Sequence, residues 1–191
     1  MRRTLLALSI ALLPLAAAQA SEEEHGSLGK HEHGVATLDV ALDGQTLELQ
    51  LESPAMNIVG FEHAASSAAD QAKAASAKAQ LQQALELFGL PAAAGCSIAS
   101  LELHSPLFGD AAHDHDHDHD HDQSAGEHAH EHSDVDAAYR LTCSQPQQLN
   151  GLDLGLFFQR FPATEKLQVQ LIGPNGQQGA ELSPGNPRLN F

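Results

Sequence analysis

Residues 113–122 read HDHDHDHDHD, five His-Asp repeats, and this run limits how the chain of 191 residues can fold. A second histidine-rich stretch, EHAHEH, follows at residues 127–132, and no Lys or Arg lies between Asp110 and Asp136. Such a segment buries no apolar side chains, and its aspartates repel one another. We therefore expect residues 110–134 to form a disordered loop, with the fold built from the sequence on either side of it.

Alternating histidines and aspartates are typical of metal binding. Imidazole nitrogen is a good ligand for zinc, copper and nickel, and alternate residues of an extended chain point the same way. The aspartates concentrate cations and can accept the second N–H of an imidazole. A pH sensor is the alternative, because histidine clusters titrate at about pH 6. We predict Zn²⁺ binding by the histidines of this loop, which are His113, His115, His117, His119, His121, His128, His130 and His132.

Composition and motifs exclude several other functions. The formal net charge of −16 attracts cations and repels nucleic acid and anionic lipid, so we expect no nucleic-acid partner. The chain contains no HExxH metalloprotease motif and no nucleophile elbow. A flexible run of many exchangeable ligands also differs from the three rigid ligands of a catalytic zinc. We predict that the protein is not an enzyme.

The first twenty residues are typical of a secretory signal peptide. Arg2 and Arg3 precede an apolar run over residues 4–17, and Ala18-Gln19-Ala20 offers a cleavage site of small residues. The alternative is an uncleaved membrane anchor, but the apolar run is short for a bilayer span. We predict cleavage after Ala20, export to the periplasm and no stable membrane insertion after cleavage.

Cys96 and Cys143 flank the histidine-rich loop and are the two cysteines of the chain. In an exported protein a disulfide is the first expectation, ahead of a thiolate metal site. Such a bond would close a long loop and thereby restrict the unfolded chain. We predict a Cys96–Cys143 disulfide.

Hydrophobic periodicity predicts strands and helices on both sides of the loop. Residues 35–42 and 46–51 alternate apolar and polar side chains around Asp43-Gly44, which is a strong hairpin signal. Residues 64–88 are rich in Ala, Gln, Lys and Leu and stop at Gly89, as a helix does. Further strands are expected over residues 98–103, 135–143, 167–172 and 177–182, and a short helix over residues 149–161.

These elements predict an α+β fold with mainly antiparallel strands, one long Ala-rich helix and one short helix. Residues 21–109 and residues 135–191 each contain strands that flank a helix. This arrangement favours two similar α+β halves, interrupted by the disordered metal-binding loop over residues 110–134.

Two segments of the first half carry a resemblance to a known family. His31-Glu32-His33-Gly34 leads into the first strand, and residues 53–63 read SPAMNIVGFEH. Together with the acidic histidine loop and FFQRFP at residues 157–162, they resemble the zinc-regulated periplasmic proteins of the ZrgA family. The likeness covers nearly the whole chain after the signal peptide. The PAMNIVGFEH segment is its specific part, because other zinc-import proteins also carry His/Asp runs.

The resemblance implies zinc acquisition alongside a zinc ABC importer, and an ordered zinc site in addition to the loop. Carried over residue by residue, the candidate ligands are His31, His33 and His63, with His104 and Glu62 as further candidates. The alternative is that His63 only caps the helix or faces solvent at its start, and that His31 and His33 belong to a frayed terminus. The expected partners are zinc ions and the importer or its periplasmic binding protein.

Two functions are compatible with these observations. The first is capture of Zn²⁺ and its delivery to an importer, which predicts one tight, ordered site together with weaker sites in the loop. The second is a storage or detoxification sponge for zinc, copper or nickel without a dedicated recipient. A sponge predicts loop sites only, with copper favoured by the Irving–Williams order.

Overall fold

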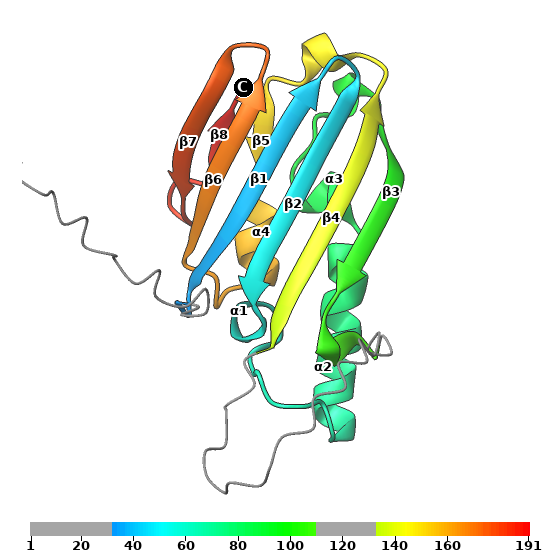
Figure 1. Cartoon of the computed structure of the whole chain (residues 1–191), viewed down its shortest axis with the longest axis vertical. Helices are drawn as coiled ribbons and strands as arrows, with labels where there is room; N and C mark the ends of the chain where they lie inside the picture. The colour runs from blue at the N-terminus through cyan, green and yellow to red at the C-terminus, as the bar shows by residue number, and fades with distance from the viewer. Residues whose placement is uncertain (1–31, 110–132) are drawn as a thin grey trace, which may run out of the picture. The chain divides into compact units, whose positions relative to one another are not determined.

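The computed structural model describes residues 32–109 and 133–191, and strands from both parts of the chain form one sheet. Its six strands lie in the order β3-β4-β2-β1-β6-β7, and β5 and β8 form a separate pair (Figure 1). Neighbouring strands of the sheet are antiparallel except β1 and β6, which are parallel. The strands are β1 (Val35–Asp43), β2 (Thr46–Pro54), β3 (Cys96–His104), β4 (Asp134–Cys143), β5 (Gly151–Asp153), β6 (Lys166–Gly173), β7 (Gly176–Leu182) and β8 (Arg188–Asn190).

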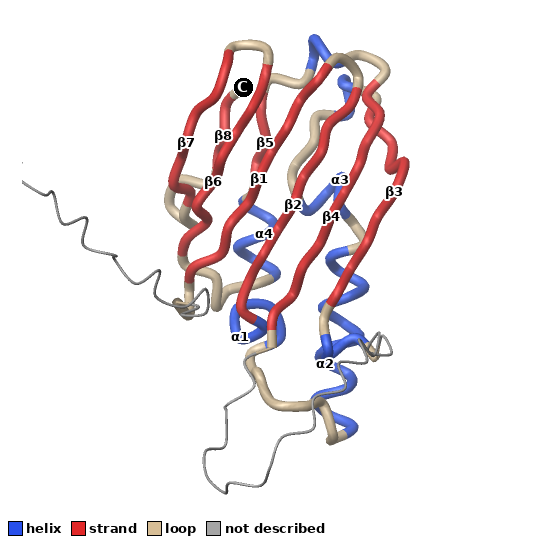
Figure 2. Tube along the Cα trace, viewed as in Figure 1, coloured by secondary structure: helices blue, strands red, loops and turns tan. Residues whose placement is uncertain are grey.

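The helices lie on one side of this sheet, behind the strands in the view of Figure 2. No helix or strand of the described residues covers the other side, which we call the open face (Figure 1). The α-helices are α1 (Ala55–Val59), α2 (Ala68–Leu81), α3 (Ala84–Leu87) and α4 (Gly155–Arg160). Short 3₁₀ turns are η1 (Ala92–Ala94), η2 (Pro106–Phe108) and η3 (Pro146–Gln148).

The predicted hairpin is confirmed. β1 and β2 pair in register down to Asp43 opposite Thr46, which leaves Gly44 and Gln45 as the turn. Gly44 has a φ of +56°, the left-handed conformation that a tight hairpin turn uses. Alternate side chains of both strands, such as Leu38 and Leu49, are almost completely buried against the helices. The apolar residues of the alternating pattern are therefore those on the face of the sheet that the helices cover.

The other predicted strands are also found, as β3, β4, β6 and β7. Cys96 and Cys143 lie opposite each other in the β3–β4 pair and form the predicted disulfide. The bond joins the end of this strand pair that lies away from residues 105–133, which connect the two strands along the chain.

The predicted fold class, with one long helix, one short helix and two similar halves, is wrong. The chain forms a six-stranded mixed sheet that is backed by helices, together with the β5–β8 pair. β4, which follows the histidine-rich loop, lies between β3 and β2, and β6 pairs in parallel with β1. These pairings join residues far apart in sequence, and local periodicity does not encode them.

The helix expected over residues 64–88 is divided into α2 and α3. Ser67 is the N-cap of α2, since its side chain accepts a hydrogen bond from the backbone N–H of Asp70, so the helix begins only at Ala68. At the other end the buried Tyr139 hydroxyl donates to the carbonyl of Leu81 at 3.1 Å. In a continuous helix this carbonyl would accept a hydrogen bond from the Leu85 N–H. Here the Tyr139 hydroxyl, a tertiary contact, takes the place of that helical donor.

The short helix expected over residues 149–161 is confined to α4, because residues 151–153 form β5 and pair with β8. The FFQRFP segment lies at this helix and supplies core side chains. Phe157 packs at ring-centroid distances of 5.2 Å from Phe161 and 6.4 Å from Phe88. This part of the family resemblance therefore reflects packing.

The predicted signal peptide, residues 1–20, lies outside the described residues, as does most of the predicted disordered loop. Within residues 32–109 and 133–191, no helix is both long enough and apolar enough to cross a membrane.

Candidate metal site

The buried side chain of Asn57 joins the two segments that carry the family resemblance. Its Oδ1 accepts a hydrogen bond from the Gly34 N–H at 2.7 Å, and its Nδ2 donates to the Val35 carbonyl at 2.9 Å. Gly34 has a φ of +86°, which a residue with a side chain rarely adopts. The Asn57 amide thus fixes the turn that follows His33 against α1.

This turn brings His33 to Glu62. The His33 Nε2 lies 2.9 Å from the Glu62 Oε1, although the two residues are 29 positions apart in sequence. The imidazole is half exposed, whereas the Glu62 side chain retains only 13% of its accessible surface. The carboxylate is therefore held in place by its surroundings while the imidazole faces solvent.

His63, which follows Glu62 in the chain, forms a second histidine–carboxylate pair. Its Nε2 lies 3.5 Å from the Oδ2 of Asp70 in the first turn of α2, and its ring centroid is 4.8 Å from that of Phe61. The Ser67 hydroxyl donates to the same carboxylate at 2.6 Å. Hydrogen bonds from Ser67 and then from His63 lower the pKa of Asp70, so its ionised form is favoured.

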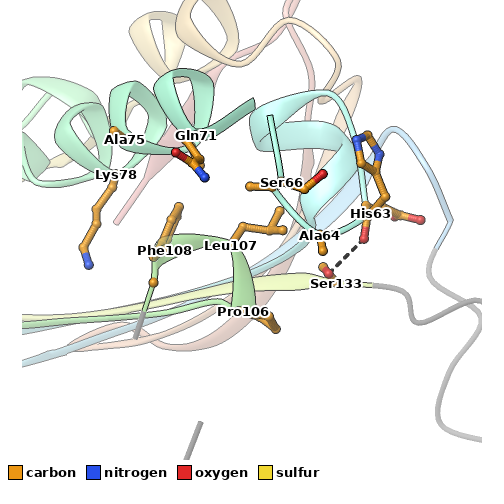
Figure 3. A pocket seen from close by; sticks show the side chains of 14 residues that line it. His63, Ala64, Ser66, Gln71, Ala75, Lys78, Pro106, Leu107, Phe108 and Ser133 are labelled. Carbon is orange, nitrogen blue, oxygen red and sulfur yellow. Dashed lines mark hydrogen bonds between the residues drawn. The ribbon is translucent and has the colours of Figure 1, made fainter. Parts of the chain in front are cut away.

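Ser133 attaches the end of the histidine-rich loop to these pairs. Its hydroxyl donates to the Glu62 carbonyl at 2.9 Å, as the dashed line in Figure 3 shows, and its own carbonyl accepts from the Ala55 N–H at 2.8 Å. A cavity of about 890 Å³ lies beside His63, and both Gly109 and Ser133 line it. The residues on either side of the segment 110–132 therefore line the same cavity.

Within the described residues, no other predicted ligand lies at these two pairs. His104 lies at the end of β3, where its Nε2 is 3.9 Å from the Glu102 Oε2 and both side chains are largely exposed. In the described part of the chain, no three His, Cys, Asp or Glu side chains gather closely enough to hold a metal ion. The predicted ligands outside that part are His31, His113, His115, His117, His119, His121, His128, His130 and His132.

Sequence reasoning missed Asp70 and Asn57. Asp70 follows Ser67 at the spacing of an N-terminal helix cap, and this signal could have placed its carboxylate at the start of α2, near His63. Asn57 lies within the PAMNIVGFEH segment. Its role depends on a contact with Gly34, 23 residues away, and no local pattern predicts that contact.

These features define a protein built on one open-faced sheet, with two histidine–carboxylate pairs where β1 and β4 begin. A family model described as ZrgA family zinc uptake protein matches residues 30–191, and the chain belongs to this family. The predicted family resemblance is thereby confirmed. The family is one of zinc uptake proteins and not an enzyme family. No curated protein matches the chain.

Proposed function

We propose that the protein captures Zn²⁺ in the periplasm and supports high-affinity zinc uptake through an ABC importer. Three observations support this proposal. The chain belongs to a zinc uptake family, it begins with a sequence typical of a secretory signal, and it carries a long run of imidazole ligands. The ligand is zinc itself, and the importer or its binding protein receives the ion.

The geometry of the two histidine–carboxylate pairs carries the proposal. Zinc bonds to imidazole nitrogen and carboxylate oxygen are about 2.0–2.2 Å long, so two such ligands on a tetrahedral ion lie about 3.4 Å apart. The separations of 2.9 Å in the His33–Glu62 pair and 3.5 Å in the His63–Asp70 pair lie on either side of this value. Each pair thus offers two ligands with little rearrangement.

The remaining ligands come from the histidines next to the described residues. His132 precedes Ser133 in the chain, and the Ser133 hydroxyl donates a hydrogen bond to the Glu62 carbonyl. His31 lies two residues before His33. We propose that a pair and one or two of these imidazoles form a site of three or four ligands.

The two histidine–carboxylate pairs and the histidine-rich loop contribute differently to zinc binding. The loop offers many similar ligands and a high local negative charge, which suits rapid capture of cations. The pairs are positioned by Asn57, Ser67 and the helix that follows, so they lose less conformational entropy on binding. The site that contains a pair should therefore bind zinc more tightly than the loop alone.

Calorimetric zinc titration of three proteins tests this function: the unaltered chain, His33→Ala/His63→Ala, and a chain with residues 110–131 replaced by a Gly-Ser linker of equal length. We expect the double alanine variant to lose the tightest binding event, with at least a tenfold weaker first dissociation constant. The linker variant should lose the multiple weak events. Keeping His132 and Ser133 preserves the attachment to Glu62.

His104→Ala is the matched control, because it removes an exposed imidazole from the open face. It should leave the tightest event unchanged. If the linker variant binds no zinc at all, the pairs do not form a site. The sponge alternative would then gain support, and it predicts tighter copper than zinc binding.

A further inference from the structure

The open face of the sheet has short side chains on three of its strands. Ala41 of β1, Ala138 of β4 and Ser100 of β3 line a hollow of about 410 Å³ there. Asp39 and Glu102 line opposite parts of the same hollow, on β1 and β3. Long polar side chains usually cover a solvated sheet face, so this hollow leaves room for side chains from another molecule.

Cations are few on the open face and are already paired. Arg140 forms an ion pair with Glu48, and the Lys166 Nζ lies 3.2 Å from the Glu181 carboxylate. The other four Lys and Arg residues of the described chain, Lys73, Lys78, Arg160 and Arg188, belong to α2, α4 and β8. No cation of the described residues pairs with Asp39, so the hollow carries excess negative charge.

The strand register places the two carboxylates in one line across the sheet. Asp39 is opposite Gln50, Gln50 is opposite Ala138, and Ala138 is opposite Glu102. Three strand spacings separate the ends of this line, which is roughly 14 Å. The line therefore has an acidic group at each end and short or neutral side chains between them.

We propose that the open face is the docking surface for a basic protein surface, whose Lys or Arg side chains enter the hollow between Asp39 and Glu102. The proposal rests on the proposed function, because docking is the step by which captured zinc would reach its recipient. Opposite charges would steer the two proteins together and fix their orientation.

Charge also excludes the other candidate occupants of this face. Residues 110–132 contain no Lys or Arg, and a second copy of the chain carries the same net charge of −16. Both would be repelled by Asp39 and Glu102, and so would an anionic lipid surface. A protein with exposed Lys or Arg side chains is the occupant that the charges favour.

Charge reversal on the open face tests the proposal. Asp39→Lys and Glu102→Lys each change the net charge by the same amount as the control Glu86→Lys, which alters an exposed carboxylate on α3. Each variant is expressed in a strain that lacks the native gene and is grown with a zinc chelator. The purified full-length variants are also titrated with zinc, and their urea unfolding is measured.

We expect the two open-face variants to lose growth under zinc limitation while binding zinc within twofold of the unaltered protein. Glu86→Lys should support normal growth. The neutral variant Asp39→Asn/Glu102→Gln should give an intermediate growth defect and keeps the test valid if a lysine variant is unstable. Normal growth of both lysine variants, or a loss of their zinc binding, would overturn the docking proposal. An unaltered protein that binds no zinc would instead contradict the proposed function.

Discussion

At the scale of single residues, Asn57 has a structural role that can be measured. Replacing it with alanine leaves the buried Gly34 N–H and the partly buried Val35 carbonyl without this partner. Each unsatisfied buried group costs about 1–3 kcal/mol, so we expect Asn57→Ala to lower the free energy of unfolding by about 2–4 kcal/mol. Urea denaturation measures this loss, with the exposed Asn150→Ala as the control. Equal stabilities of the two variants would contradict this role.

The sequence alone indicated part of the candidate site at this scale. The family resemblance indicates His33, His63 and Glu62 as candidate ligands, because they lie in the segments that carry it. The sequence did not indicate that His33 pairs with Glu62 while His63 pairs with Asp70. The pairing depends on where α2 begins and on the turn at Gly34, and both are set by side-chain to backbone hydrogen bonds.

At the scale of elements, the Cys96–Cys143 disulfide joins β3 to β4 at the end remote from the histidine–carboxylate pairs. A cross-link over a long loop stabilises the fold mainly by restricting the unfolded chain. We expect Cys96→Ala/Cys143→Ala to lower the free energy of unfolding by about 2–4 kcal/mol. Zinc affinity of the folded variant should stay within twofold of the unaltered protein. Urea denaturation and calorimetry check the two expectations, and a variant of unaltered stability would contradict the first.

Strands were predicted more accurately than helices. The alternation in β1, β2 and β4 follows directly from burial of one sheet face, and it was visible in the sequence. The buried positions Ala74, Ala77, Leu81, Ala84 and Phe88 also keep a helical spacing, although the chain leaves the helix at Gln82 and Gln83. Contacts from Tyr139 and Arg160 are made there, and both residues come from distant parts of the chain.

At the scale of the whole molecule, the histidine-rich loop is an insertion between two adjacent strands of one sheet. β3 and β4 pair along their length, and residues 105–133 connect them at the end where β1 also begins. The sequence suggested a boundary between two halves at this position because the composition changes so sharply. Composition shows where a chain cannot bury apolar side chains, but it does not show which strands pair across the interruption.

The ligand chemistry of the whole molecule can be tested by pH. Zinc binds neutral imidazole and competes with protons for the same nitrogen, so affinity should fall as histidines become protonated. We therefore expect zinc affinity to fall steeply below about pH 6. The fall should be steeper for a site with two imidazole ligands than for a site with one, because each imidazole competes with a proton.

Calorimetric zinc titration at pH 7.5, 6 and 5 measures this dependence, with His33→Ala/His63→Ala as the comparison. The variant should show a shallower pH dependence of its first binding event, because fewer imidazoles take part. Carboxylates such as Asp70, whose pKa is lowered, remain ionised over this range and add no steep dependence of their own. Binding that is unchanged from pH 7.5 to pH 5 would mean that carboxylates, and not histidines, supply the ligands.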